Sequence, residues 1–255
     1  MTRSAILAPD GYERFEVGST VVVARVAAAP GLRSALATAA SLHEWAATSP
    51  GAEPFQGRAT AWGVRLPGAA IDVVVRHAQR GGLLRGVRGD RFVWPGRAPW
   101  ELETALRLQE AGVRTPDVVA FALYPAGPGL CRCDVATRRL PVGAEFPVSW
   151  RDADGAAHDA MLIAVSTLLR DLRAAGARHP DLNAKNLYLA REGGRWAAWV
   201  LDVDRVRFRA PDGADVGAQN LARLDRSLRK LRARKALAID DTALTRLAEL
   251  AGNAA

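Results

Sequence analysis

The segment HPDLNAKNLYL, residues 179–189, decides the fold of this 255-residue chain. It places a histidine, an aspartate and two asparagines directly before an alternating apolar run. One interpretation is a polar turn, because Asp and Asn side chains bond nearby backbone groups. The other is a phosphoryl-transfer loop, where an aspartate accepts the proton of the acceptor hydroxyl and an asparagine five residues later binds metal. His179, Asp181 and Asn186 have the spacing of such a loop.

A phosphoryl-transfer site needs a second acidic residue that reaches the same metal ions from a neighbouring strand. The apolar segments 186–190 and 197–202 are predicted to form a hairpin around the residues EGG. This hairpin would bring Asp202, in VLDVD, beside Asn186. Asp202 is therefore the candidate metal ligand. Asp204 stands where protein kinases carry a glycine, and it could add a third carboxylate or contact the acceptor.

The phosphates also need a cradle and a cation upstream. The segment GRATAWG, residues 57–63, lies where a glycine-rich loop would cover the phosphates, with Gly57 as its candidate contact, although an ordinary hairpin turn is an alternative. Arg76 ends an apolar strand in the place of the kinase lysine, and its planar fork of donors can clamp two phosphate oxygens. A solvent-exposed edge arginine is the other interpretation. Glu101, or alternatively Glu103, would orient Arg76 from the following helix.

The hydrophobic pattern along the chain predicts an α+β, two-lobed molecule. Together with the kinase-like loop motif, the expected architecture is a two-lobed protein-kinase-like fold. Strands dominate the first half and helices the second. Residues 1–140 would form an N-terminal extension and a small β-rich, nucleotide-binding N-lobe, and residues 141–255 a compact helical, catalytic C-lobe, together one domain. Predicted strands cover 20–26, 55–66, 71–77, 118–125 and 129–141. Predicted helices cover 31–47, 99–111, 157–175, 216–235 and a short segment from about 241.

Composition restricts the partners and the compartment. Thirty-five basic residues against 27 acidic ones give a net charge of +8, which suggests an anionic partner, although an arginine-rich genome would give the same excess. No apolar run approaches the roughly 18 residues that a membrane span needs, and a secretory signal is not evident, so a cytoplasmic protein is expected. Cys131 and Cys133 are interpreted as ordinary strand cysteines.

Several segments resemble the lipopolysaccharide kinase family, most closely its 3-deoxy-D-manno-octulosonic acid (Kdo) kinases. The resemblance extends from about residue 55 to residue 235. It is carried by VVVRHAQRGGLL, GDRFVWPGRAPWELETALRLQEAGVRTP, HPDLNAKNLYL, VLDVDRVRF and QNLARLDRSLRK. The chain departs from the family pattern at Ala59, Lys185 and Tyr188, and none of these positions removes a catalytic group.

The resemblance implies an ATP- and Mg²⁺-dependent transferase on the cytosolic face of the inner membrane. Its acceptor would be a hydroxyl of Kdo, or of another inner-core sugar such as heptose, on a lipid A precursor. Asp181 would be the catalytic base, and Asn186 and Asp202 the metal ligands. Peripheral contact with the anionic membrane could come from the arginine-rich loop 80–91 or from helix 216–235, although either could equally be a solvated basic surface.

Two other functions remain open from the sequence. The same scaffold could serve a small atypical protein kinase or another small-molecule phosphotransferase. A basic nucleic-acid-binding protein with an inactive kinase fold would also explain the charge. The second is disfavoured, because few aromatic residues are interleaved with the basic ones and the catalytic set is intact, so no nucleic acid partner is expected.

Overall fold

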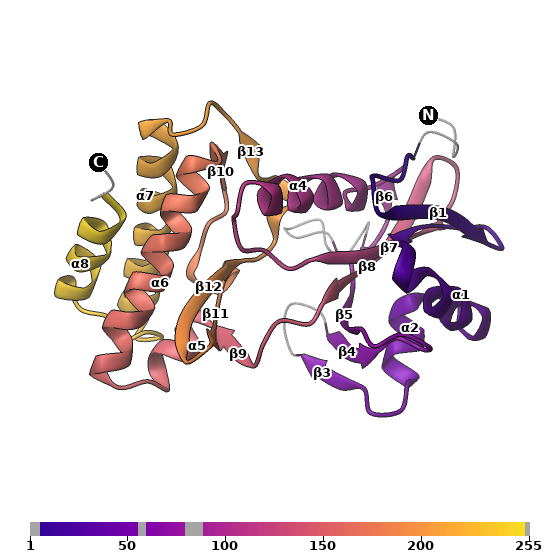
Figure 1. The fold of residues 1–255 in the computed structure, drawn as a ribbon, viewed down its shortest axis with the longest axis horizontal. Coiled ribbons are helices and arrows are strands. Elements are labelled where there is room, and N and C mark those ends of the chain that lie inside the picture. The colour runs from indigo at the N-terminus through magenta and orange to yellow at the C-terminus, as the bar shows by residue number, and fades with distance from the viewer. Residues whose placement is uncertain (1–5, 56–59, 80–88, 253–255) are drawn as a thin grey trace. The chain divides into compact units, whose positions relative to one another are not determined.

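The computed structural model describes residues 6–55, 60–79 and 89–252 (Figure 1). These residues form two compact units. Unit 1 comprises Met1–Leu102 and Asp117–Arg139, and unit 2 comprises Glu103–Pro116 and Leu140–Ala255. Residues 103–116 thus belong to unit 2 although they precede residue 140, and the division into lobes 1–140 and 141–255 stays a prediction.

Unit 1 is built on an antiparallel sheet with the strand order β1-β2-β7-β8-β5-β4-β3, and β6 also pairs with β8. Strands β4 and β5 form a hairpin around the residues LPGA, with Val64 opposite Val73. Of the predicted strand 55–66, Phe55 lies in β3 and residues 61–65 form β4, while residues 56–59 lie outside the described residues. The strands are β1 Tyr12–Val17, β2 Thr20–Arg25, β3 Glu53–Phe55, β4 Ala61–Arg65, β5 Asp72–His77, β6 Phe92–Val93, β7 Val118–Pro125 and β8 Leu130–Arg138.

Two helices, α1 Ala29–Thr38 and α2 Leu42–Thr48, replace the single helix that was predicted over 31–47. The helix is interrupted because Ser41 caps the start of a new one. The Ser41 hydroxyl accepts a hydrogen bond from the Glu44 amide, and the Glu44 carboxylate accepts one from the Ala40 amide. The first contact satisfies an amide that a helix start leaves open, and the second ties the residue before the N-cap to the first turn of α2. Both helices pack on the sheet through one apolar core that includes Leu32 and Trp45.

Unit 2 combines three long helices with short strands. Strand β11 lies between β12 and β9, and β10 pairs with β13. Helix α4, Ala98–Glu110, starts in unit 1 and continues into unit 2. The remaining elements are β9 Gly143–Glu145, α5 Phe146–Arg151, α6 Gly155–Ala174, β10 Ala177–Arg178, β11 Leu187–Glu192, β12 Arg195–Val200, β13 Arg207–Phe208, α7 Ala214–Ala233 and α8 Asp241–Gly252, with short 3₁₀ turns at Ala184–Asn186 and Val203–Arg205.

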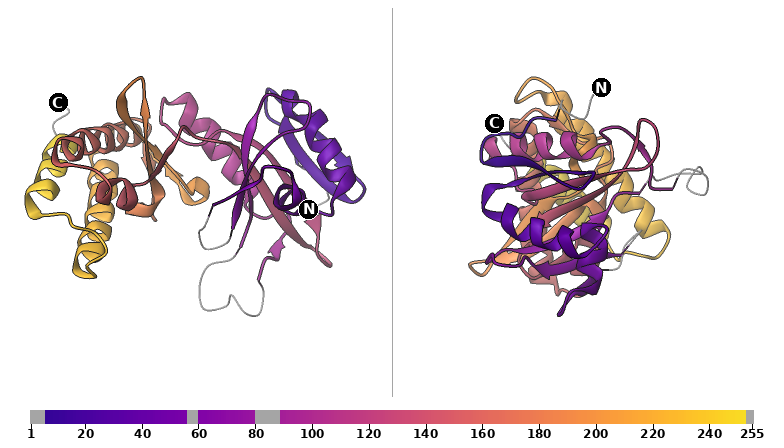
Figure 2. Two further views of the ribbon diagram at one scale, coloured as in Figure 1. Left: turned by 90° about the horizontal axis from the view of Figure 1, so that it is seen from below. Right: turned by 90° about the vertical axis from the view of Figure 1, so that its right-hand side faces the viewer.

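Helix α6 forms the centre of unit 2 and contacts α7, α8 and β12 (Figures 1 and 2). Its apolar stripe is buried, and each such side chain contributes about 1.5–3 kcal/mol on burial. The stripe consists of Met161, Leu162, Val165, Leu168, Leu169 and Leu172. The helix ends before Gly176, whose φ of +63° suits glycine and whose Cβ, if present, would lie 2.3 Å from the carbonyl oxygen of Arg209. This turn leads the chain from α6 into the candidate loop.

Candidate active site

The loop after β10 is folded by its own asparagines. The carbonyl oxygen of Asp181 accepts hydrogen bonds from Nδ2 of Asn183 at 3.0 Å and from Nδ2 of Asn186 at 2.9 Å. Oδ1 of Asn183 accepts one from the Lys185 amide. The loop is therefore a polar turn and a candidate catalytic loop at once. Because Asn186 uses its amide nitrogen for the turn, its Oδ1 is the atom available to a cation.

His179 connects this loop to the end of β12. Its Nδ1 lies 3.3 Å from the Asp181 amide, which can only donate, so the ring proton is on Nε2 and is donated to the carbonyl oxygen of Leu201 at 3.2 Å. Burial lowers the pKa of His179, which favours this neutral form. His179 therefore braces the loop.

The hairpin of β11 and β12 places Asp202 next to Asn186 along the ladder. Leu187 lies opposite Val200, and the Leu201 amide donates to the carbonyl oxygen of Asn186 at 2.8 Å. Asp202 follows at once, exposed and in the left-handed region at φ 57° and ψ 50°, a conformation that costs a non-glycine residue some strain and that recurs at functional sites. The charges of Asp202, Asp181 and Asp204 each raise the pKa of His179 against the effect of burial, so all three carboxylates lie within electrostatic reach of this ring.

The donor set suits a magnesium ion that is shared with a nucleotide. Over residues 6–55, 60–79 and 89–252, no group of three His, Cys, Asp or Glu side chains is arranged to hold a metal ion by itself. Mg²⁺ needs no such cage, because it usually binds one or two carboxylates together with waters and substrate phosphates. The amide oxygen of Asn186 and the carboxylate of Asp202 are hard oxygen donors of this type. They therefore fit the ion that a phosphoryl transfer requires.

One face of helix α7 holds the loop in place. Asn220, only 1% exposed, accepts a hydrogen bond from the His179 amide and donates to the carbonyl oxygen of Ala177, both at 2.9 Å. One turn later Arg223 donates to Asp181, and Ser227 accepts from the Ala184 amide at 3.2 Å. Spacings of three and four residues put these three side chains on the same face of a helix. They account for three of the polar positions within the QNLARLDRSLRK motif.

Sequence reasoning missed this role of α7. It assigned Arg223 and Arg229 to a basic surface that could contact lipid. In the structure Arg223 binds Asp181, while Arg229 binds Asp225 at 2.8 Å and Asp241 at 3.2 Å. The i, i+3, i+7 repeat of polar residues was a usable signal, but a solvent-exposed helix face gives the same pattern.

In unit 1, Arg76 and Glu101 form an ion pair. Arg76 lies near the end of β5, and its Nη2 bonds to Oε1 of Glu101 in the first turn of α4. The Glu101 side chain is buried, whereas Glu103 is exposed. A buried glutamate fixes the guanidinium while 36% of the arginine side chain stays accessible. Gly57 lies outside the described residues, and so do Arg80, Arg85 and Arg88 of the basic loop.

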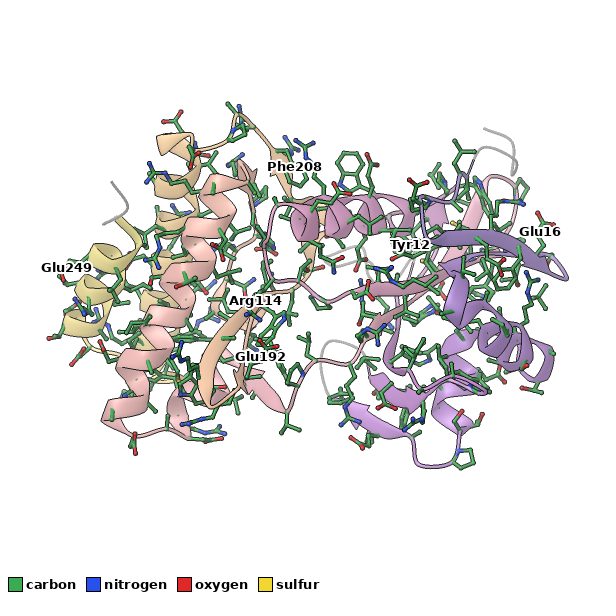
Figure 3. The ribbon with its side chains drawn as sticks, in the orientation of Figure 1. Tyr12, Glu16, Arg114, Glu192, Phe208 and Glu249 are labelled. Carbon is green, nitrogen blue, oxygen red and sulfur yellow. The ribbon has the colours of Figure 1, made fainter. Side chains whose placement is uncertain are left out.

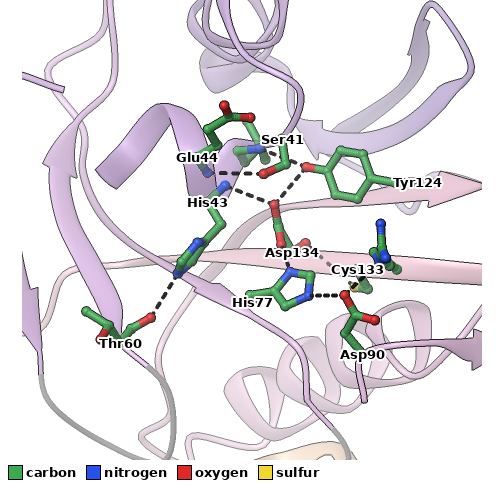
Figure 4. Close-up of polar contacts among 11 residues, drawn as sticks. Ser41, His43, Glu44, Thr60, His77, Asp90, Tyr124, Cys133 and Asp134 are labelled. Carbon is green, nitrogen blue, oxygen red and sulfur yellow. Dashed lines mark hydrogen bonds and ion pairs between the residues drawn. The ribbon is translucent and has the colours of Figure 1, made fainter. Parts of the chain in front are cut away.

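Beside Arg76 lies a buried polar network that the sequence did not reveal (Figure 4). Asp134 is fully buried and accepts hydrogen bonds from the Tyr124 hydroxyl at 2.9 Å and the His43 amide at 2.9 Å. His77 lies between Asp134, at 2.6 Å from its Nδ1, and Asp90, at 3.2 Å from its Nε2. The hydrogen bond to Asp134 is the main cause that raises the pKa of His77 against desolvation. The strand that carries Arg76 is thus tied firmly to β8.

An antiparallel sheet carrying an arginine–glutamate pair, and a helical unit carrying an aspartate–asparagine loop, define a protein-kinase-like phosphotransferase. A solved structure described as WaaP in complex with acyl carrier protein has this fold, with a TM-score of 0.51 and 18% identity over 84% of this chain and 83% of that chain.

The sequence comparisons assign the chain within this class. The model of the lipopolysaccharide kinase (Kdo/WaaP) family matches residues 35–246. The 3-deoxy-D-manno-octulosonic acid kinase of Stenotrophomonas maltophilia (strain R551-3) is 31% identical over 196 residues, 71% of this chain and 70% of that protein. The enzyme of the same name from Actinobacillus succinogenes is 28% identical over 184 residues, 70% and 75% of the two chains. The chain belongs to the lipopolysaccharide kinase family, and it is a phosphotransferase that acts on a sugar hydroxyl.

Proposed function

We propose that the protein transfers the γ-phosphate of ATP, with Mg²⁺, to a hydroxyl of Kdo on a lipid A precursor. The observation that carries this proposal is the joint placement of Asp181, Asn186 and Asp202 around His179. The acceptor follows from the names of the relatives, which are Kdo kinases at 28–31% identity. A basic chain also suits an anionic, lipid-linked acceptor.

Each site residue has one role in this reaction. Asp181 accepts the proton of the sugar hydroxyl as its oxygen bonds to the γ-phosphorus, and the bond to the β-phosphate oxygen breaks to release ADP. Asn186 and Asp202 would hold Mg²⁺, which neutralises charge on the phosphate oxygens. Arg76, fixed by Glu101, would bind phosphate oxygens as well, and Gly57 would lie in the loop that covers them.

Phosphorylation of purified Kdo-lipid A tests this function. With labelled ATP and Mg²⁺, the full-length protein is expected to place label on the Kdo residue, and chelation of the metal is expected to stop the transfer. A precursor that ends in heptose, a soluble sugar and a protein mixture serve as competing acceptors. Label on the protein mixture alone, or on the soluble sugar and never on lipid A, would contradict the proposal.

We also propose that the protein works on the anionic cytosolic surface of the inner membrane as a peripheral protein. None of the described helices is long and apolar enough to cross a membrane. Val93 is 70% exposed and Trp100 51%, and both lie in a stretch of unit 1 that also presents Arg91 and Arg97 on the surface. Tryptophan favours the interface between water and lipid, and arginine favours anionic headgroups. This stretch is therefore the candidate membrane contact.

Replacing Val93 and Trp100 together by serine is expected to weaken vesicle binding about tenfold, because losing the burial of two apolar side chains costs 1.4 kcal/mol or more. Co-sedimentation with vesicles that contain anionic lipid measures this. Val142→Ser, at a position that is 94% exposed in unit 2, is the matched control and should bind like the wild type. Equal binding by the double variant and the wild type would exclude this surface.

A further inference from the structure

Arg223 has hydrogen-bonding capacity that the protein does not use. A guanidinium carries five N–H donors. In the described residues Nε donates to the carbonyl oxygen of Pro180 at 3.1 Å, and Nη2 donates to Oδ1 of Asp181 at 2.7 Å. The other N–H groups of Arg223 have no partner there. The side chain is 31% exposed and that of Asp181 32%, so a ligand can reach both.

The position of this guanidinium is fixed before any ligand arrives. Asn220 and Ser227, one turn to either side on α7, bond to the same loop as Arg223. The bond from Nε to Pro180 sets the plane of the fork. A cation that is already held in place binds an anion with little further loss of conformational freedom. Such a group is therefore suited to recognition.

An acceptor hydroxyl that reaches Asp181 brings the rest of its sugar next to Arg223. The hydroxyl must come within about 2.6–3.2 Å of the Asp181 carboxylate to give up its proton. Arg223 lies 2.7 Å from that same carboxylate, so the other substituents of the ring fall within its reach. Kdo is an acid and is ionised at neutral pH, whereas heptose carries no carboxylate. The guanidinium fork matches a carboxylate with two parallel hydrogen bonds.

We infer that Arg223 binds the carboxylate of the acceptor sugar and makes the site select an acidic sugar over a neutral one. The inference rests on the proposed function and narrows its acceptor. Arg223 also allows the two carboxylates, one of Asp181 and one of the acceptor, to approach each other, because it lies beside both. With a neutral residue at this position, the two carboxylates would repel each other.

The test combines a protein variant with a change in the acceptor. Wild type and Arg223→Gln are each assayed with Kdo-lipid A and with an analogue whose Kdo carboxylate is reduced to an alcohol. Wild type is expected to lose about 10- to 100-fold in kcat/KM on the analogue, as for the loss of hydrogen bonds to a charged group. On Kdo-lipid A, Arg223→Gln is expected to have a kcat/KM lower than that of the wild type by a similar factor. On the analogue, the variant and the wild type should have nearly the same kcat/KM, because the protein change and the acceptor change remove the same interaction.

Two further variants sharpen the result. Arg114→Gln is the matched control: Arg114 also lies in unit 2, pairs with Glu192 at 2.5 Å and is partly exposed, and it should behave as wild type (Figure 3). Arg223→Lys keeps the charge without the planar fork and should lose less than Arg223→Gln, and only on the natural acceptor. The KM for ATP should stay unchanged in every variant.

Wild-type activity that is equal on both acceptors would overturn the inference and leave the proposed function standing. Equal losses by Arg223→Gln on both acceptors, together with a higher KM for ATP, would assign Arg223 to the phosphate donor and would also overturn it. Failure of the wild type on both acceptors would instead remove the proposed function, and the inference with it.

Discussion

Replacing Asp181 by asparagine is expected to lower the rate of phosphoryl transfer by about 10²–10⁴-fold, the contribution of a positioned general base. An amide of the same shape cannot accept the hydroxyl proton. The substitution should affect kcat with little change in the KM for ATP, because the role proposed for Asp181 does not involve the nucleotide. Single-turnover transfer from Mg-ATP to the lipid acceptor measures this step directly.

The fold should survive that change. The side chain of Asp181 contacts Arg223, and an asparagine oxygen can accept the same hydrogen bond. The bonds that shape the loop run through the backbone of Asp181, to His179, Asn183 and Asn186, and do not depend on its carboxylate. Thermal unfolding of the variant should therefore match that of the wild type.

Asp225→Asn serves as the matched control for Asp181→Asn. Asp225 also pairs with an arginine, Arg229 at 2.8 Å, but away from the loop. Its loss should leave turnover within about twofold of the wild type, as expected for an exposed ion pair. Normal turnover by Asp181→Asn, with the control also normal, would remove Asp181 from the mechanism.

The position of the proposed catalytic loop could be predicted from the sequence because the proposed chemistry fixes its spacing. In the proposed mechanism Asp181 and Asn186 stand five residues apart to serve one acceptor and one metal, and the following apolar hairpin brings Asp202 back to them. The residues that hold the loop are not constrained in this way. Any side chain of suitable length on α7 could do so, and neither Asn220 nor Ser227 differs in sequence from a solvent-exposed polar residue.

The buried network in unit 1 shows a second limit to what can be predicted from the sequence. His77 and Asp134 are 57 positions apart in the chain and meet because β5 and β8 pair in a register that places them directly opposite each other. The order and the register of strands follow from packing of the whole sheet, not from local pattern. In contrast, the break between α1 and α2 was predictable, because Ser41 and Glu44 have the spacing of a capping box.

Replacing Asp134 by alanine is expected to destabilise the protein by about 3–5 kcal/mol, the cost of removing one partner of a buried ion pair. The Asp134 side chain is fully buried. Its loss leaves the Tyr124 hydroxyl, the His43 amide and His77 without their acceptor (Figure 4). Urea unfolding followed by tryptophan fluorescence measures the change. Asp90→Asn is the comparison, because Asp90 is 30% exposed and its contact with His77 is longer.

The ion pair of His77 and Asp134 also predicts how the stability of the protein depends on pH. The pKa of His77 is raised in the folded protein, so its charged form binds more tightly there than in the unfolded chain. The resulting stabilisation is fully present below the unfolded pKa of about 6.5 and is lost as the pH rises through the higher folded pKa. His77→Gln should remove this dependence, and Asp134→Ala should reduce it strongly. If the unfolding free energy of the wild type does not change with pH over this range, the His77–Asp134 contact does not stabilise the charged form of the ring. The cost expected for Asp134→Ala would then be only that of losing neutral hydrogen bonds.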